Sequence, residues 1–177
     1  MIIDLALVRA RGKPLRVERE FPEDEFELQS AVLQLVSPVQ VETEIRVSGK
    51  RVRVSGELAV EVDLTCCRCL STLRRSLKKG FKLDYRPDPE SLSIHEEALD
   101  YAELEIGFYH QDRLDLTDLV GEQILLELPI NPVCQSSCKG LCDQCGINLN
   151  QGQCSCERQV LDPRLAVLHE LKKKLES

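Results

Sequence analysis

The chain has 177 residues, of which 42% are hydrophobic and 30% are charged, and its formal net charge is −7. This length suits one domain with at most a small appendage, and the charge excludes a uniformly basic nucleic-acid coat protein. The apolar runs are short and Met1 leads straight into a strand-like segment, so we expect neither a membrane span nor a signal peptide. The expected location is the cytoplasm.

The first half of the chain has the pattern of a series of β-strands. Short strands are predicted over residues 2–8 and 14–19, and a loop or short helical piece over 20–31. The clearest pattern lies in residues 39–65, where apolar residues alternate on both sides of a Ser-Gly-Lys turn. It predicts an antiparallel hairpin with one buried face and a bulge at Gly56, where the alternation breaks.

The second half combines strands with two helices. Strands are predicted over residues 70–85 and near 104–108. One helix is predicted from an N-cap at Asp115 to Pro129, and another begins at Asp162.

We therefore predict an α+β fold. Its β-rich antiparallel body carries a few helices and a C-terminal zinc-knuckle segment, and a small open barrel is one form that this body could take. The predicted divisions are a body with an acidic segment and one helix over 1–130, a cysteine-rich segment over 131–160, and a terminal helix packing on the body over 161–177.

Nine cysteines are the unusual feature of the composition. A reducing cytoplasm disfavours disulfides, and the odd number does so too, which leaves metal binding as the expected use of clustered thiols. The strongest set is Cys142, Cys145, Cys154 and Cys156, four thiols within 15 residues that suit a tetrahedral zinc ion. Gly146 follows the first pair, where a glycine lets the backbone turn under the metal.

A second site is predicted from the remaining thiols. Cys66 and Cys69 follow the hairpin strand, and with Cys134 and Cys138 they complete another four-thiolate set that would clamp the later segment onto the hairpin. Exchange of Cys134 or Cys138 into the other set is the alternative grouping, and Cys67 is left over. An iron–sulfur cluster would also use four thiolates. Redox catalysis is disfavoured, because Cys66 and Cys69 follow a hairpin and do not precede a helix in a βαβ unit.

The charge is distributed unevenly along the chain. Residues 43–82 sum to +6, and residues 83–130 sum to −11. The basic part contains a cluster that would contact RNA phosphates or form a solvated strand face: Arg68, Arg74, Arg75, Lys78, Lys79 and Lys82. The acidic part suits a basic protein partner or a solvated surface.

The sequence shows no constellation of catalytic residues. Its three histidines are isolated, and it has no glycine-rich phosphate loop and no nucleophile elbow. We therefore expect a binding protein and not an enzyme.

The cysteine segments resemble those of the YceD family, which is named for large ribosomal RNA subunit accumulation. Residues 66–70 are similar to its C-x-R-C-L signature, and residues 138–150 to its C-K-G-L-C-x-x-C-G-x-x-L-N block. The resemblance covers roughly residues 40–175. Some members keep the first signature but lack the distal cysteines, and Cys67 departs from the usual polar residue.

The resemblance implies a non-catalytic bacterial or plastid factor needed for normal accumulation and processing of 23S rRNA. The implied partners are 23S rRNA or a precursor particle of the large subunit. Ribosomal protein L32 is a further implied partner, because the two genes are commonly neighbours in bacteria. The alternative function is a chaperone or binding module for a basic ribosomal protein such as L32.

Overall fold

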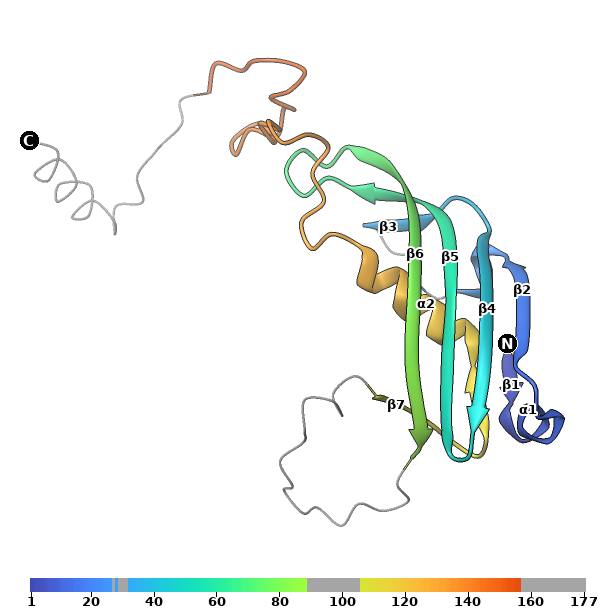
Figure 1. Ribbon diagram of the computed structural model, residues 1–177. Helices are drawn as coiled ribbons and strands as arrows, with labels where there is room; N and C mark the ends of the chain where they lie inside the picture. Colours follow the sequence, from blue (N-terminus) through green and yellow to red (C-terminus); the bar gives the residue numbers. More distant parts are fainter. Residues whose placement is uncertain (27, 29–31, 89–105, 157–177) are drawn as a thin grey trace, which may run out of the picture. The chain divides into compact units, whose positions relative to one another are not determined.

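The computed structural model describes residues 1–26, 28, 32–88 and 106–156. Its main element is an open six-stranded sheet in the order β2-β4-β5-β6-β7, in which β3 also pairs with β5 (Figure 1). The strands are β2 (Leu15–Phe21), β3 (Leu33–Leu35), β4 (Val39–Ser48), β5 (Arg51–Thr65), β6 (Thr72–Pro87) and β7 (Ile106–Tyr109). Paired strands are antiparallel except β6 and β7, which are parallel. The predicted β-rich α+β fold is confirmed, with a mixed sheet that does not close into a barrel.

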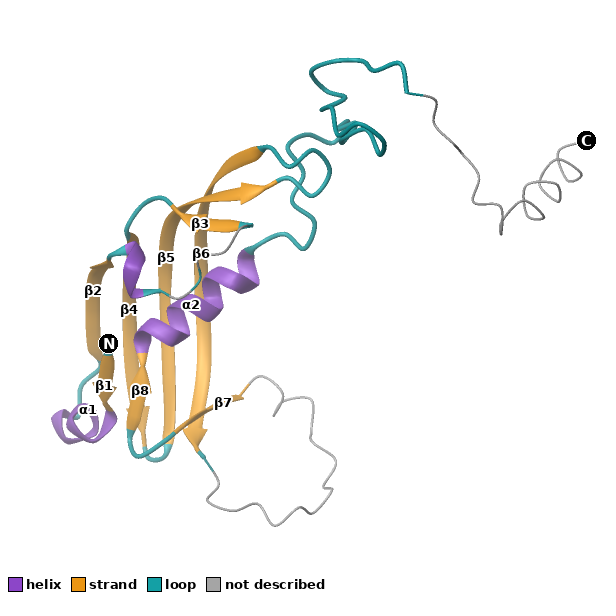
Figure 2. Cartoon of the chain, turned by 180° about the vertical axis from the view of Figure 1, so that it is seen from behind, coloured by secondary structure: helices purple, strands orange, loops and turns teal. Residues whose placement is uncertain are grey.

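The remaining elements are short, apart from one helix. Strands β1 (Ile2–Asp4) and β8 (Arg113–Asp115) form a separate two-stranded sheet. The helices are α1 (Leu5–Arg11), α2 (Leu116–Glu127) and a 3-10 turn over Glu23–Glu25. Helix α2 lies across one face of the large sheet (Figure 2). Among the described helices, none has the length and apolar character needed to cross a membrane.

The large sheet has one apolar face and one polar face. On β5, the even-numbered residues from Val52 to Leu64 face the core, and the odd-numbered ones are polar apart from Ala59. The same alternation holds on β4. This period of two is the pattern that predicted the hairpin, and the structure confirms the hairpin and the strand after it. The polar face, which we call the open face, is on the side of the sheet away from the core.

Helix α1 begins inside the segment predicted as a first strand. The apolar residues Ile3, Leu5 and Leu7 alternate as in a strand, but the capping chemistry decides otherwise. Asp4 accepts a hydrogen bond from the backbone N–H of Leu7, and Gly12 ends the helix at a φ of 62°. Leu5 and Val8 are then the buried residues of the helix, so the prediction of a strand over 2–8 holds only for its first part.

The predicted bulge at Gly56 is wrong. Pairing between β4 and β5 runs one residue to one residue from Gln40 opposite Ala59 to Ser48 opposite Arg51. Gly56 occupies a core-facing position, and the apparent break arises because it has no apolar side chain. A Cβ at this position would lie 2.2 Å from the carbonyl oxygen of Glu42 and 2.8 Å from Cα of Thr43. The backbones therefore approach too closely for any residue but glycine.

Substituting Gly56 by alanine is expected to destabilise the sheet by about 1–3 kcal/mol, because backbone must move to admit the methyl group. Gly80 on the neighbouring strand is the matched control, since the nearest atom to its added Cβ is 3.9 Å away. The free energy of unfolding of Gly80→Ala is expected to lie within about 1 kcal/mol of the wild-type value. Urea unfolding followed by circular dichroism measures both, and equal effects would contradict this account of Gly56.

The chain divides into two compact units. Unit 1 comprises Met1–Thr65 and Thr72–Pro132, and unit 2 comprises Cys66–Ser71 and Val133–Ser177. The loop between β5 and β6 thus belongs with the cysteine-rich segment. The predicted helix after Asp162 lies outside the described residues, and the predicted boundaries at 130 and 160 stay a prediction.

Candidate metal centres

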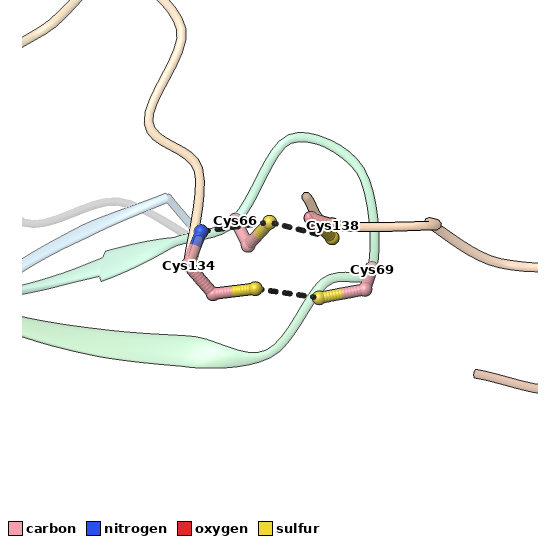
Figure 3. Close-up of side chains that lie close together, drawn as sticks. All are labelled: Cys66, Cys69, Cys134 and Cys138. Atoms are coloured by element: carbon pink, nitrogen blue, oxygen red, sulfur yellow. Dashed lines mark hydrogen bonds between the residues drawn. The ribbon is translucent and has the colours of Figure 1, made fainter. Parts of the chain in front are cut away.

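Four cysteines from two distant segments meet in unit 2. We call this set the hairpin-loop cluster: Cys66 and Cys69 from the loop between β5 and β6, with Cys134 and Cys138 (Figure 3). Their sulfur atoms all lie within 4.8 Å of one another. The Sγ atoms of Cys66 and Cys138 are 3.9 Å apart, and those of Cys69 and Cys134 are 3.6 Å apart. Thiolates around a tetrahedral zinc ion, with Zn–S bonds of about 2.3 Å, are separated by about 3.8 Å.

The backbone of the loop holds its two cysteines in place. Thr65 pairs with Thr72, and the chain between them turns through hydrogen bonds from Cys66 N to Ser71 O and from Leu70 N to Cys66 O. Leu70 has a φ of 58°, a conformation that costs a non-glycine residue about 1 kcal/mol. This turn is what directs both sulfurs to the same side.

Arg68 connects the loop to the segment after Val133. Its Nη1 donates to the carbonyl oxygen of Cys138 at 3.1 Å, and its own carbonyl accepts from the N–H of Leu141, also at 3.1 Å. Gly140 lies against this backbone at a φ of 77°, and an added Cβ would be 3.1 Å from the Arg68 carbonyl oxygen. Arg68 therefore has a structural contact that its predicted role in RNA binding did not include.

The other four thiols form what we call the knuckle cluster, Cys142, Cys145, Cys154 and Cys156, whose sulfurs also lie within 4.8 Å of one another. The N–H of Gly146 donates to the carbonyl of Cys142 at 2.9 Å, and Gly146 has a φ of 72°. The glycine thus makes the turn that the sequence predicted for it. The structure brings together both predicted groups of four, and either cluster could hold a metal ion.

The thiols within each cluster differ in acidity. Backbone N–H groups, that of Cys69 first, lower the pKa of Cys66 to about 6, and those of Cys145 and Gln144 lower the pKa of Cys142 to about 7. Burial and the neighbouring thiols raise the pKa of Cys134 to about 12, and hydrogen bonding with Cys145 raises that of Cys156 to about 12. Four adjacent thiolates repel one another, and a divalent cation offsets that repulsion because it accepts all four.

Asn150 connects residues around the two clusters. Its Nδ2 donates to Cys138 Sγ at 3.4 Å and to Asn148 Oδ1 at 2.9 Å, while its Oδ1 accepts from the N–H of Lys139 at 2.8 Å. The N–H of Leu149 in turn donates to the carbonyl of Gly140. One amide side chain therefore orients a thiol of the hairpin-loop cluster from the turn that follows the first knuckle pair. The sequence offered only one signal for this residue, its place at the end of the 138–150 block.

Asn150→Ala is expected to weaken metal binding by the hairpin-loop cluster about 10- to 100-fold, the usual effect of removing a hydrogen bond to a ligand. The knuckle cluster should be unaffected. The measurement is chelator competition with zinc, with cobalt absorption as a second readout. Gln151→Ala is the control, because the Gln151 side chain makes no hydrogen bond among the described residues. Unchanged metal affinity in Asn150→Ala would contradict a role in orienting Cys138.

The six basic residues predicted to contact RNA do not share one surface of unit 1. Arg74, Lys78 and Lys82 lie on the open face, whereas Arg75 and Lys79 alternate with them on β6, and Arg68 belongs to unit 2. Among the residues that the structure describes, carboxylates pair with three of the six: Asp63 with Arg74 at 2.9 Å, Glu57 with Lys78 at 3.6 Å, and Glu127 with Lys79 at 2.7 Å. Contact between this cluster and RNA stays a prediction.

Comparison with known proteins now assigns the chain to a family. The family profile described as "Large ribosomal RNA subunit accumulation protein YceD" matches residues 54–172, about two thirds of the chain. The chain belongs to the YceD family. This confirms the resemblance found in the cysteine segments. All eight cysteines of the two clusters lie inside the matched range, as do β6 and α2.

Several YceD relatives are known by sequence. A protein of Arabidopsis thaliana, "Large ribosomal RNA subunit accumulation protein YCED homolog 1, chloroplastic", is 26% identical over 161 residues, which cover 79% of this chain and 50% of that protein. An uncharacterised protein of Mycobacterium bovis is 33% identical over 121 residues, which cover 68% of this chain and 55% of that protein. YlbN of Bacillus subtilis, also uncharacterised, is 28% identical over 146 residues, which cover 80% of this chain and 78% of YlbN.

This chain spans about half the length of the first two relatives. No solved structure matches it. The YceD name points to a role in the accumulation of the large ribosomal subunit RNA, and it describes an accumulation factor rather than an enzyme.

Proposed function

We propose that this chain is a non-catalytic factor in large ribosomal subunit biogenesis that promotes the accumulation and processing of 23S rRNA. The observation that carries the proposal is the YceD match over residues 54–172. The geometry supports a binding role, because the potential metal-ligating groups found among the described residues are the two sets of four cysteines. Four protein ligands fill a tetrahedral ion and leave no open position for substrate or water, which is typical of structural sites.

Zinc is the ion that we propose for both clusters. Four thiolates suit zinc or an iron–sulfur cluster, and the Cys142-x2-Cys145-Gly146 turn favours a zinc knuckle. When bound, zinc would supply structural stabilisation by tying the loop 66–71 to the segment that begins at Val133. Elemental analysis of protein purified without added metal should give about two zinc ions per chain. Iron with visible absorption would contradict zinc, and a folded protein without metal would contradict both sites.

Ribosome gradients test the function itself. The protein should sediment with immature large subunits in wild-type cells, and its depletion should lower 23S rRNA relative to 16S rRNA. Unchanged 23S rRNA after depletion would overturn the proposal. If 23S rRNA falls while the protein stays at the top of the gradient, it acts before the particle forms, and binding to a ribosomal protein such as L32 becomes the better account.

A further inference from the structure

A group of arginines gathers on the open face of the sheet, at the end that carries the β4–β5 turn. Together with one lysine they form what we call the arginine surface: Arg16, Arg46, Arg51, Arg53 and Lys82. They come from four adjacent strands, β2, β4, β5 and β6. Arg46 lies directly opposite Arg53, and Lys82 lies opposite Ser55. Four of the five residues precede residue 54, so this surface lies mostly outside the range of the YceD match.

Two carboxylates hold the four arginines in pairs. Glu44 accepts from Nε of Arg16 at 3.1 Å and also from Nε of Arg46. Asp84 accepts from Arg51 at 2.9 Å and 3.3 Å and from Arg53 at 3.0 Å and 3.2 Å. The arginine side chains are 42–85% exposed, whereas those of Glu44 and Asp84 are 20% and 21% exposed. The guanidinium groups therefore cover the carboxylates, and a molecule approaching this end of the open face meets mainly positive charge.

The carboxylates stay ionised and the surface stays basic at neutral pH. Hydrogen bonds from Arg53 and Arg51 lower the pKa of Asp84 to about 2, and those from Arg46 and Arg16 lower the pKa of Glu44. Five positive and two negative side chains leave a local charge of +3 on a chain whose net charge is −7. Arg46 and Arg53 are like charges directly opposite each other, and Glu44 and Asp84 offset part of their repulsion.

The arginines keep hydrogen-bond donors for an anion. Arg16 and Arg46 use Nε on Glu44, and their terminal Nη groups make no hydrogen bond among the described residues. Arg51 and Arg53 likewise keep Nη1. A guanidinium whose orientation is already fixed by one carboxylate loses less entropy when it binds a second anionic oxygen.

The acidic side chains of the open face mark the limit of the surface. Glu18, Glu42 and Glu57 lie opposite one another across β2, β4 and β5, next to the row that holds Arg16 and Lys82. This row repels a polyanion, so contact should stay on the turn side of it. Among the described residues of β2, β4, β5 and β6, the open face carries no aromatic side chain, whereas on β7 the exposed ring of Phe108 lies in register with Arg86 of that face.

We propose that the arginine surface binds the sugar-phosphate backbone of RNA. The inference rests on the proposed function and deepens it, because it names the surface that meets ribosomal RNA. An array of outward guanidinium groups suits closely spaced phosphates. Because the five residues of the arginine surface are all cationic and none is aromatic, the contact should be strongly dependent on salt and largely independent of base sequence.

The test is binding of deproteinised 23S rRNA by the full-length zinc-loaded protein, measured by filter binding from 50 to 200 mM salt. The surface variant replaces Arg16, Arg46, Arg51 and Arg53 by Gln, an amide that still donates to Glu44 and Asp84. The comparison variant replaces Arg74, Arg75, Lys78 and Lys79 by Gln and changes the net charge by the same amount. Circular dichroism and zinc content must match wild type in both.

We expect the surface variant to bind about 10- to 100-fold more weakly near 100 mM salt and to lower the salt slope by about 3, because each phosphate contact contributes about 0.7–0.9. The affinity of the comparison variant for 23S rRNA should lie within about threefold of the wild-type affinity. Equal losses in both variants, or a loss confined to the comparison variant, would overturn the proposal. If wild type does not bind 23S rRNA but sediments with precursor particles, the RNA surface is wrong while the proposed function stands.

Discussion

Cys66→Ser is expected to remove one of two zinc ions per chain and to unfold the loop 66–71 together with residues 133–141, which precede the knuckle cluster. Cys66 is fully buried, and its sulfur lies 3.9 Å from that of Cys138. The binding free energy of a structural zinc ion, roughly 10–16 kcal/mol, is also folding free energy. Loss of a ligand should therefore cost more stability than any other single substitution considered. Elemental analysis and amide hydrogen exchange of Leu141, whose N–H bonds to Arg68, measure the two effects.

Cys67→Ser is the matched control. Cys67 is the next residue in the same loop, but its side chain is exposed and it belongs to neither cluster. It should keep two zinc ions and the protection of Leu141. Loss of zinc from Cys67→Ser, or two zinc ions in Cys66→Ser, would mean that the ligand set is different.

Phe21→Ala is expected to destabilise unit 1 by about 3–5 kcal/mol, because a fully buried aromatic ring leaves a cavity that the sheet edge cannot fill. Phe21 packs edge-on against Phe26 with ring centroids 5.9 Å apart, and the Arg19 guanidinium lies 4.8 Å from the Phe21 ring centroid. The chain has no tryptophan, so urea unfolding is best followed by circular dichroism. The zinc content of the folded variant should remain two.

Phe108→Ala makes the same change on β7, where the ring is 53% exposed. Its effect should stay below about 1 kcal/mol. Comparable destabilisation by the two substitutions would show that the core does not depend on Phe21 as proposed. Together with Cys66→Ser, the pair separates what the apolar core contributes from what the metal clusters contribute.

The sequence predicts the parts of the fold whose pattern is local. Alternation identified the hairpin of β4 and β5, and Asp115 was identified as the N-cap of α2, where it accepts from the N–H of Thr117. The four thiols of the knuckle cluster also lie close together in the sequence. The prediction of a strand over 2–8 is too long, because Ile3, Leu5 and Leu7 alternate as in a strand, whereas the hydrogen bond from Leu7 N–H to Asp4 begins a helix.

Contacts between strands were harder to predict. The sequence places Arg74 and Arg75 next to each other, and we predicted that both belong to one basic cluster. In the strand β6 they lie on opposite faces of the sheet, because successive side chains alternate. The carboxylate that pairs with Arg74, Asp63, is on another strand. The arginine surface depends on the same kind of information, because the three-residue turn predicted at Ser48-Gly49-Lys50 does not give the register that places Arg46 opposite Arg53.

The hairpin-loop cluster has a topological consequence. Cys69 and Cys134 are 65 residues apart, so an ion held by both would close the intervening chain into a ring. The entropic free-energy cost of closing a loop of this size is about 2 kcal/mol greater than that of closing the nine-residue loop from Cys145 to Cys154. The knuckle loop is therefore the easier of the two to close around an ion. Once the ring is closed, a cut in any of its peptide bonds leaves two fragments that the ion links in addition to the strand pairing of the sheet.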